Sequence, residues 1–441
     1  MKKNYKLIAF ASLMIVSSAQ SFAQCGGSRF HDYVFPTPPT ATSNIVYGHN
    51  LTASGIDTVL KLDVYQPVGD VSTSRPLVIA IHGGSFVGGS KTGGDVVPFC
   101  KDLARLGYVT ASMEYRLGMT NFPFGSHTVD STDAAAELMR AVQDARAAVR
   151  FFRKDARVGG NTYKIDTNNI FLLGVSAGGL TALHLAYLDQ MSEFPNYIDT
   201  TGVTSGSVTG EPGLHGGLEG LSGNPGYPST VKAIVNICGA LGDTLWMHPG
   251  DVPVLSFHGT ADGTVPYGYA TIAVLGIPLL KVCGSSVVAK RADHIGIPNC
   301  METWLGADHV PESGTSASNL RYYDSCITIT RTWLEHFTCA TAQNCSYTAT
   351  PIVMGVDELA NNMDYSIYPN PANSHAIIDL AAFNGKTVNI ELYDALGRKV
   401  VNTENMKTDR FLLNKNNLPA GMYFINVISE GKIYSKKIIF E

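Results

Sequence analysis

Near the middle of the 441-residue chain stands Gly174-Val175-Ser176-Ala177-Gly178, a match to the pattern G-x-S-x-G. An apolar run at 169–173 precedes it, and residues compatible with a helix follow at 180–187. A tight turn from a buried strand into a helix exposes its serine at the sheet edge and admits only small neighbours. The N-terminus of the following helix also stabilises negative charge near the hydroxyl. We therefore predict that Ser176 is a nucleophile, the alternative being an ordinary glycine-rich turn.

Strand-like apolar runs that alternate with helical stretches surround this motif. The run at 76–81 is continuous and rich in β-branched residues, as in a strand buried on both faces. Further predicted strands occupy residues 60–65, 108–115, 231–237, 253–257 and 301–305. Helical spacing of apolar residues marks the stretches 133–156, 285–292 and 320–337. This alternation predicts an α/β fold with a mainly parallel sheet, which we place within residues 24–340.

One long segment, residues 190–230, interrupts the alternation. It is rich in Gly, Ser, Thr and Pro. A loop of this length within a compact domain is usually functional or mobile. Our hypothesis is a surface insertion that borders the site of Ser176.

The first 23 residues have the features of a signal peptide. They combine three early lysines, a short apolar stretch at 7–16 and small residues for cleavage at 21–23. The apolar stretch is too short to span a bilayer, so we expect no transmembrane segment in the mature chain. Cys25 would suit a lipoprotein, but Gln24 stands where such a site needs a small residue. We therefore expect an exported protein.

Cysteine content and charge narrow the chemistry further. Eight cysteines follow the signal peptide, and an even number in an oxidising compartment favours structural disulfides. Connectivity does not follow from the sequence, but Cys283 with Cys300 and Cys339 with Cys345 are the local pairs to test first. No cysteine spacing is typical of zinc sites, and we predict neither a metal nor an organic cofactor. With a net charge of −5, the composition does not favour a nucleic-acid partner.

A serine hydroxyl needs a base within hydrogen-bond reach, and the base needs a carboxylate that orients it. After a nucleophile of this kind, the carboxylate and then the histidine follow along the chain. Asp262 lies in a short acidic loop just beyond the predicted strand 253–257, at the edge where Ser176 emerges. We predict that Asp262 is the orienting carboxylate.

Three histidines are candidates for the base. His258 lies on the strand side of the acidic loop, where a packed role is the default, and His294 lies at a helix end. His309 follows the last predicted strand, and the small residues Gly306 and Ala307 let its loop turn inward. We favour His309 and keep His294 as the alternative.

Backbone amides must stabilise the oxyanion that develops during attack on a carbonyl. We assign this role to the amide of Ala177 and to those of Gly84 and Ser85, in the loop after the strand at 76–81. Loops at the same edge also carry three aromatic residues that we expect to contact substrate: Phe86, Trp246 and Tyr267.

The composition changes from about residue 341. Residues 341–364 resemble a linker, and residues 365–441 contain short strands without helices. Within 388–393, apolar and polar residues alternate as in a half-buried strand. We predict a separate small β-sandwich.

Several spaced motifs of this segment resemble the C-terminal sorting domain of the type IX secretion system. They are Tyr368-Pro369-Asn370-Pro371, Leu392-Tyr393-Asp394-Ala395-Leu396-Gly397-Arg398, Leu418-Pro419-Ala420-Gly421-Met422-Tyr423 and Lys436-Lys437-Ile438-Ile439. The resemblance implies that the type IX machinery is a partner and that the protein is secreted or held at the cell surface. A carbohydrate-binding or adhesive sandwich is the alternative.

The catalytic segment, about residues 45–337, resembles the α/β-hydrolase carboxylesterases. The resemblance rests on His82-Gly83-Gly84, on residues 174–179, on the acidic loop and on His309. The combination of the His82-Gly83-Gly84 loop with residues 174–179 is similar to the branch that includes hormone-sensitive-lipase-like, feruloyl and acetylxylan esterases. Two positions depart from family patterns: Val175 replaces the Glu of carboxylesterase type B enzymes, and Ser85 replaces the third glycine of an HGGG loop.

The resemblance implies an α/β-hydrolase fold and a serine ester hydrolase without cofactor. Acylated plant polysaccharides or other small esters are the expected substrates, by analogy of fold and compartment. A serine peptidase of the prolyl-oligopeptidase type is one alternative, although the chain lacks the propeller domain of such enzymes. A catalytically silent adhesion module is the other.

Overall fold

The computed structural model describes residues 27–119, 131–196, 212–274, 277–343, 365–383, 385–394, 398–430 and 432–441, together with residues 25, 198, 203–204, 207–208 and 345. The chain divides into two compact units, Met1–Ala349 and Thr350–Glu441. Among the described residues, no helix has the length and apolar character needed to cross a membrane.

An eight-stranded sheet forms the centre of the first unit, with the strand order β1-β2-β4-β3-β5-β8-β10-β13. The strands are β1 (Thr42–Leu51), β2 (Asp57–Tyr65), β3 (Arg75–Ile81), β4 (Val109–Met113), β5 (Ile165–Val175), β8 (Ala233–Ile237), β10 (Val254–Gly259) and β13 (Asn299–Trp304). Only β1 and β2 run antiparallel to their neighbours. The remaining pairs are parallel, which confirms the predicted fold class.

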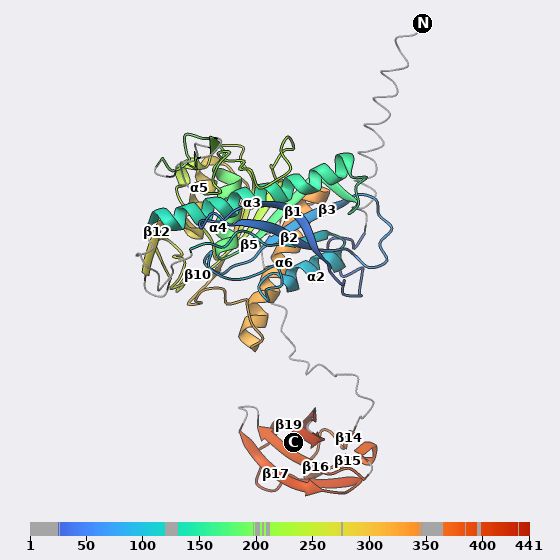
Figure 1. Ribbon diagram of the computed structural model, residues 1–441. Coiled ribbons are helices and arrows are strands. Elements are labelled where there is room, and N and C mark those ends of the chain that lie inside the picture. The colour runs from blue at the N-terminus through green and yellow to red at the C-terminus, as the bar shows by residue number, and fades with distance from the viewer. Residues whose placement is uncertain are drawn as a thin grey trace. The chain divides into compact units, whose positions relative to one another are not determined.

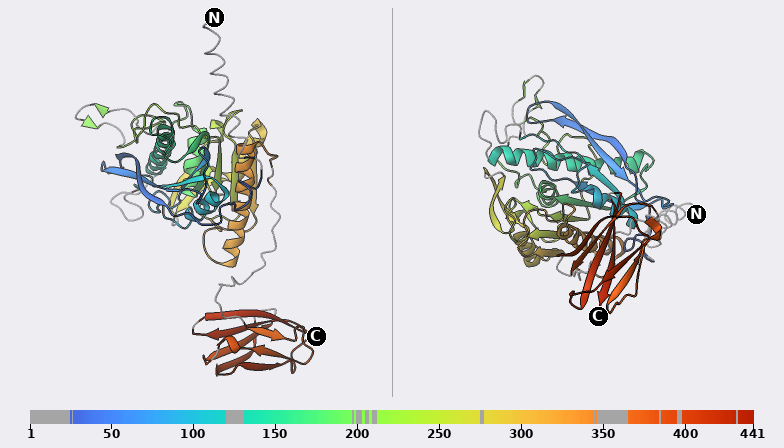
Figure 2. Two further views of the ribbon diagram at one scale, coloured as in Figure 1. Left: turned by 90° about the vertical axis from the view of Figure 1, so that its right-hand side faces the viewer. Right: turned by 90° about the horizontal axis from the view of Figure 1, so that it is seen from below.

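Helices cover both faces of this sheet (Figure 1). They are α2 (Val97–Leu106), α3 (Ser131–Val158), α4 (Ala177–Tyr187), α5 (Ser285–Ile295) and α6 (Ala317–Cys339). Figure 2 shows the teal α3 and the orange α6 on opposite sides of the strands. The alternation of side chains along a strand explains the two layers. Leu77, Ile79 and Ile81 of β3 pack with α3 and α4, whereas Val78 and Ala80 pack with α2 and α6.

Several elements of the first unit were missing from the sequence interpretation. Residues 42–51 form β1 on the antiparallel edge, where they pair with β2. A hairpin of β11 (Tyr269–Val274) and β12 (Ile277–Gly284) joins β9 (Ala240–Leu241) in a separate three-stranded sheet. The remaining elements are the 3-10 turn η1 (Thr244–Trp246) and the strands β6 (Val203–Thr204) and β7 (Ser207–Val208).

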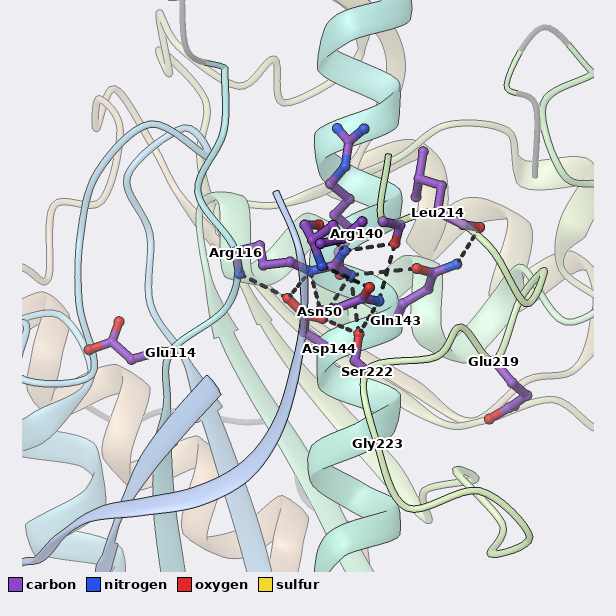
Figure 3. Close-up of polar contacts among 12 residues, drawn as sticks. Asn50, Glu114, Arg116, Arg140, Gln143, Asp144, Leu214, Glu219, Ser222 and Gly223 are labelled. Atoms are coloured by element: carbon purple, nitrogen blue, oxygen red, sulfur yellow. Dashed lines mark hydrogen bonds and ion pairs between the residues drawn. The ribbon is translucent and has the colours of Figure 1, made fainter. Parts of the chain in front are cut away.

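The described part of the glycine-rich segment is fixed to α3 by buried polar contacts (Figure 3). Arg116, whose side chain is fully buried, pairs with Asp144 at 2.8 Å and donates to the carbonyl oxygen of Gly213 at 2.7 Å. Ser222 donates to the same carboxylate at 2.5 Å, and Gln143 donates to the carbonyl oxygen of Leu214 at 3.1 Å. Because these groups satisfy loop carbonyls that would otherwise lack partners, the segment packs as part of the domain. This part of the segment is partly exposed and is anchored to the domain by these buried contacts.

Two disulfides join segments that are distant in sequence. Cys25 pairs with Cys339, and Cys300 pairs with Cys345. The two local pairs named for first testing, Cys283–Cys300 and Cys339–Cys345, do not form, because β12 and β13 belong to different sheets and Cys25 lies against the end of α6. The remaining cysteines are buried thiols: Cys100, Cys238, Cys283 and Cys326.

The second unit consists of antiparallel strands around a core of its own. One sheet contains β14 (Ser366–Tyr368), β15 (His375–Asp379) and β18 (Arg410–Asn414), and the other contains β17 (Lys399–Met406), β16 (Val388–Asp394), β19 (Gly421–Ser429) and β20 (Lys432–Phe440). A short 3-10 turn, η2 (Ala381–Phe383), follows β15. Buried apolar residues of both sheets share one cluster, as in a sandwich. Most of the predicted linker, 346–364, lies outside the described residues.

Candidate active site

Ser176 lies at a strained turn between β5 and α4, in the middle of the parallel sheet. Its backbone angles are φ 53° and ψ −116°, a conformation that L-residues rarely adopt. A Cβ atom at Gly174 would overlap the carbonyl oxygen of Gly178, and one at Gly178 would overlap that of Ile81. Only glycine therefore fits at these two positions, and the turn holds the Ser176 side chain at the end of β5.

The three residues expected to act together are in hydrogen-bond contact. Ser176 Oγ lies 2.8 Å from His309 Nε2, and His309 Nδ1 lies 2.7 Å from Asp262 Oδ2. Each residue follows a different strand of the parallel part of the sheet, namely β5, β13 and β10. The carboxyl ends of parallel strands meet at one edge, which explains how residues so far apart in sequence converge.

The side chain of Asp262 is fully buried and accepts hydrogen bonds on both oxygens. Besides the contact with His309, Oδ2 lies 3.1 Å from His258 Nε2, and Oδ1 accepts from the amides of Thr264 and Val265 at 2.9 and 2.8 Å. Burial alone would raise the pKa of Asp262, but the hydrogen bonds from the two histidines and the backbone hold it well below its ordinary value. The side chain is therefore an ionised carboxylate that can orient an imidazole.

The three candidate histidines have different surroundings. His258 is buried, as expected for a packed residue, but its contact with Asp262 was missed. The i,i+4 spacing of these two residues was the available signal. His294 is exposed in the last turn of α5, and the structure does not bring it to Ser176.

Asp308 connects the His309 loop to the acidic loop and was also missed. Its Oδ1 accepts from the amides of His309 at 2.7 Å and Gly263 at 3.0 Å. These backbone hydrogen bonds lower the pKa of Asp308. An acidic residue directly before the candidate base was the only sequence signal for this contact.

The loop after β3 contains three successive residues with an unusual backbone conformation. Gly84, Ser85 and Phe86 all have positive φ, at 116°, 54° and 60°. The Gly83 amide donates to Asp95 Oδ2 at 2.7 Å, which supports the loop. Among the described residues, the amides of Gly84, Ser85 and Ala177 find no acceptor. These donors are available to a ligand beside Ser176.

Two cavities meet at Ser176. The smaller, about 30 Å³, is apolar and is lined by Phe86, Leu180, Ile272 and Leu279 among others. A water needs roughly 10–15 Å³ of such space, so this cavity fits a small apolar group. The larger, about 540 Å³, is open and also lined by Gly84, Asp95, His309 and Ser313.

The other expected substrate contacts lie elsewhere. Phe86 lines the small cavity, but Trp246 packs against His184 at 5.5 Å between ring centroids, beside a separate cavity. Tyr267 donates to or accepts from Thr303 Oγ1 at 3.0 Å. The structure does not bring Trp246 or Tyr267 to Ser176. The described residues of 190–230 do not line either cavity at Ser176.

Comparison with known proteins identifies two segments. Residues 62–210 match BD-FAE, an esterase-like α/β-hydrolase family, and residues 366–441 match the secretion system C-terminal sorting domain. The first segment contains the turn with Ser176 and the loop with Gly84. The chain thus combines an esterase-like α/β-hydrolase segment with a sorting domain, and the latter supports secretion to the cell surface or the outside.

Individual relatives are more distant. Esterase-5C of Drosophila miranda and that of Drosophila persimilis are each 28% identical over 151 residues, which is 34% of this chain and 24% of theirs. The chain thus spans about a quarter of the length of these relatives. Thermogutta terrifontis esterase 2 phosphoramylated by tabun aligns with 68% of this chain and 95% of its own, at 20% identity and a TM-score of 0.45. Its butyrate-bound form aligns at 67% and 93%, with 19% identity and a TM-score of 0.44.

Proposed function

We propose that this protein is a secreted serine hydrolase of carboxylic esters. The observation that carries the proposal is the continuous hydrogen-bond path from Ser176 through His309 to Asp262, beside backbone amides that have no acceptor in the described part of the chain. This arrangement supplies a nucleophile, a base, an orienting carboxylate and oxyanion donors, which are the parts that acyl transfer needs.

In the proposed reaction, Ser176 Oγ attacks the ester carbonyl while His309 Nε2 accepts the hydroxyl proton. The amides of Gly84, Ser85 and Ala177 stabilise the oxyanion, and Asp262 stabilises the imidazolium. Collapse of the intermediate breaks the ester C–O bond, and His309 returns the proton to the leaving alcohol. A water then attacks the acyl-enzyme by the same route and releases the acid.

The two cavities support a substrate with a short acyl group and a larger polar alcohol part. The apolar cavity of about 30 Å³ would hold the acyl group, and the open cavity of about 540 Å³ would hold the alcohol. Acylated plant polysaccharides and other small esters have this form. The export of the protein is consistent with a polymer substrate outside the cell.

Turnover of p-nitrophenyl acetate by the purified chain, with a peptide p-nitroanilide in parallel, tests the proposal. We expect ester hydrolysis without peptide cleavage, and a loss on the order of 10⁶-fold in kcat for Ser176→Ala. Peptide cleavage would favour a serine peptidase. No turnover of any ester by the folded chain would favour a silent hydrolase fold and contradict the proposal.

A further inference from the structure

A buried thiol that the proposed reaction does not use lies next to the acid and the base. Cys238 follows β8, has a positive φ of 52° and is fully buried. It forms no disulfide. The amides of Val310 and Gly259, from the histidine loop and from β10, are directed at its sulfur.

The thiol completes a set of three different metal-binding groups. One ligand atom from each of Cys238, Asp262 and His309 lies within 4.8 Å of the others. Thiolate, imidazole and carboxylate are the zinc ligands of proteins, and three of them with an open fourth position are common. Bonds of about 2.0–2.3 Å place such ligands roughly 3.3–3.8 Å apart. His309 Nδ1 and Asp262 Oδ2, now 2.7 Å apart, would separate by roughly half an ångström, and the thiol would approach them by about 1 Å at most.

A second buried carboxyl group, that of Glu312, lies in the electrostatic surroundings of the thiol. Asp262 and Glu312 both act electrostatically on Cys238. Glu312 is buried, and among the described residues neither of its carboxyl oxygens has a hydrogen-bond partner. A thiol binds a metal as the thiolate, so the fitting occupant is a cation that binds sulfur strongly enough to displace the thiol proton.

We propose that Cys238, Asp262 and His309 form a binding site for a thiophilic divalent cation, such as Zn²⁺ or Cd²⁺, and that its occupation blocks ester hydrolysis. The blocking part rests on the proposed role of His309 as the base. The cation reaches the site past His309, which lines the open cavity and whose side chain is 16% exposed.

The chemistry of inhibition follows from the imidazole tautomer. The cation binds Cys238 Sγ, whose proton leaves to solvent, and His309 Nδ1, whose proton moves to Nε2. The contact between Nδ1 and Asp262 is replaced by a bond from each to the cation. Nε2 then carries a hydrogen and cannot accept the proton of Ser176, so attack on the ester stops.

Titration of the full chain with CdCl₂ in thiol-free buffer tests the site with two readouts. The first is the ultraviolet charge-transfer band of a cadmium thiolate, and the second is turnover relative to each variant's own cation-free rate. In the parent chain we expect the band to appear and turnover to fall over the same range of cadmium concentration. Ser176→Ala should keep the band, because the site does not need the nucleophile. This measurement remains informative even if the chain hydrolyses no ester.

Variants at the cysteines test whether Cys238 binds the cation. Cys238→Ala should remove the band and raise the half-inhibitory cadmium concentration by more than about tenfold, since losing even an outer partner of a metal site costs that much. Cys238→Ser provides the same test if the alanine variant does not fold. The matched control Cys326→Ala, at another buried thiol, should behave as the parent. An unchanged band in the Cys238 variants, or no band in the parent, would overturn the proposal.

Discussion

Asp262 is the residue on which the geometry of the site depends most. It is fully buried, and two imidazoles and two backbone amides contact its carboxylate. His309 uses this contact to present Nε2 to Ser176, whereas His258 has no contact with the nucleophile among its described partners. We therefore regard His258 as a positioning residue that holds the carboxylate, and Asp262 as the group that holds the base.

Substitution of His258 and of Asp262 should lower kcat to different extents. His258→Phe removes one hydrogen bond to a charged group, worth about 1.5–3 kcal/mol, so we expect kcat to fall roughly 10- to 100-fold with little change in KM. Asp262→Asn should cost about 10⁴-fold, because the imidazole loses its orienting carboxylate. Steady-state kinetics on one ester measures both. His294→Phe is the matched control, and a loss there equal to that of Asp262→Asn would contradict the assignment of the base.

Glu312 makes stability depend on pH in a direction that can be measured. Burial raises its pKa to about 8 from an ordinary value of 4.5. Between these values the unfolded chain releases the proton and the native chain keeps it, so the free energy of unfolding falls as pH rises. The expected contribution is about 1.4 kcal/mol per pH unit.

Glu312→Gln should remove this dependence. We expect the variant to gain stability relative to the parent between pH 5 and 8, measured by urea unfolding at several pH values. Tryptophan fluorescence suits the measurement, because Trp246, Trp304 and Trp333 all lie in the first unit. Parallel pH profiles for parent and variant would contradict the burial of an unpartnered carboxyl.

The sequence predicted the residues that chemistry constrains and missed those that only packing places. Ser176, Asp262 and His309 could be predicted from residue type and chain order. Each follows a predicted strand, and the ends of parallel strands lie at one edge of the sheet. The contact of His258 with Asp262 depends on how the acidic loop folds back over β10. The pairing of the disulfides depends on how the segments with Cys25 and Cys345 pack against the domain, and no local sequence pattern predicts that packing.

At the scale of elements, the β11–β12 hairpin determines the small cavity. Ile272 and Val274 of β11 and Leu279 of β12 form part of its wall, and Phe86 from the loop after β3 contributes to the rest. The apolar spacing in these strands is short and irregular, and the hairpin pairs with β9 outside the main sheet. For these reasons the small cavity could not be predicted from the sequence. The strand and the helix on either side of Ser176 could be predicted.

Leu279→Ala should shift the preference toward longer acyl groups. The substitution removes three carbons from the wall of this small cavity. Because one methylene changes specificity by about 10-fold or more, we expect the kcat/KM ratio of hexanoyl to acetyl ester to rise at least about tenfold. Leu245→Ala, at an exposed leucine outside the cavity, is the matched control. An unchanged ratio would mean that the acyl group binds elsewhere.

At the scale of the whole molecule, the two units have separate buried clusters. A chain that ends at Cys345 keeps both disulfides and every residue of the candidate site. We expect it to keep the kcat/KM of the full chain but to stay inside a host that carries the type IX system. Ester turnover in cells and in medium measures both effects. Export of the shortened chain, or loss of turnover with native tryptophan fluorescence, would contradict this division of roles.

The measurement that tests the central assignment most directly is mass spectrometry after reaction with a fluorophosphonate. Attack of Ser176 Oγ on phosphorus forms an O–P bond and releases fluoride. We predict one adduct per chain, located on the peptide that contains Ser176, slow formation in His309→Gln and none in Ser176→Ala. An adduct on another residue, or equal labelling of the Ser176→Ala variant, would contradict the assignment of Ser176 as the nucleophile.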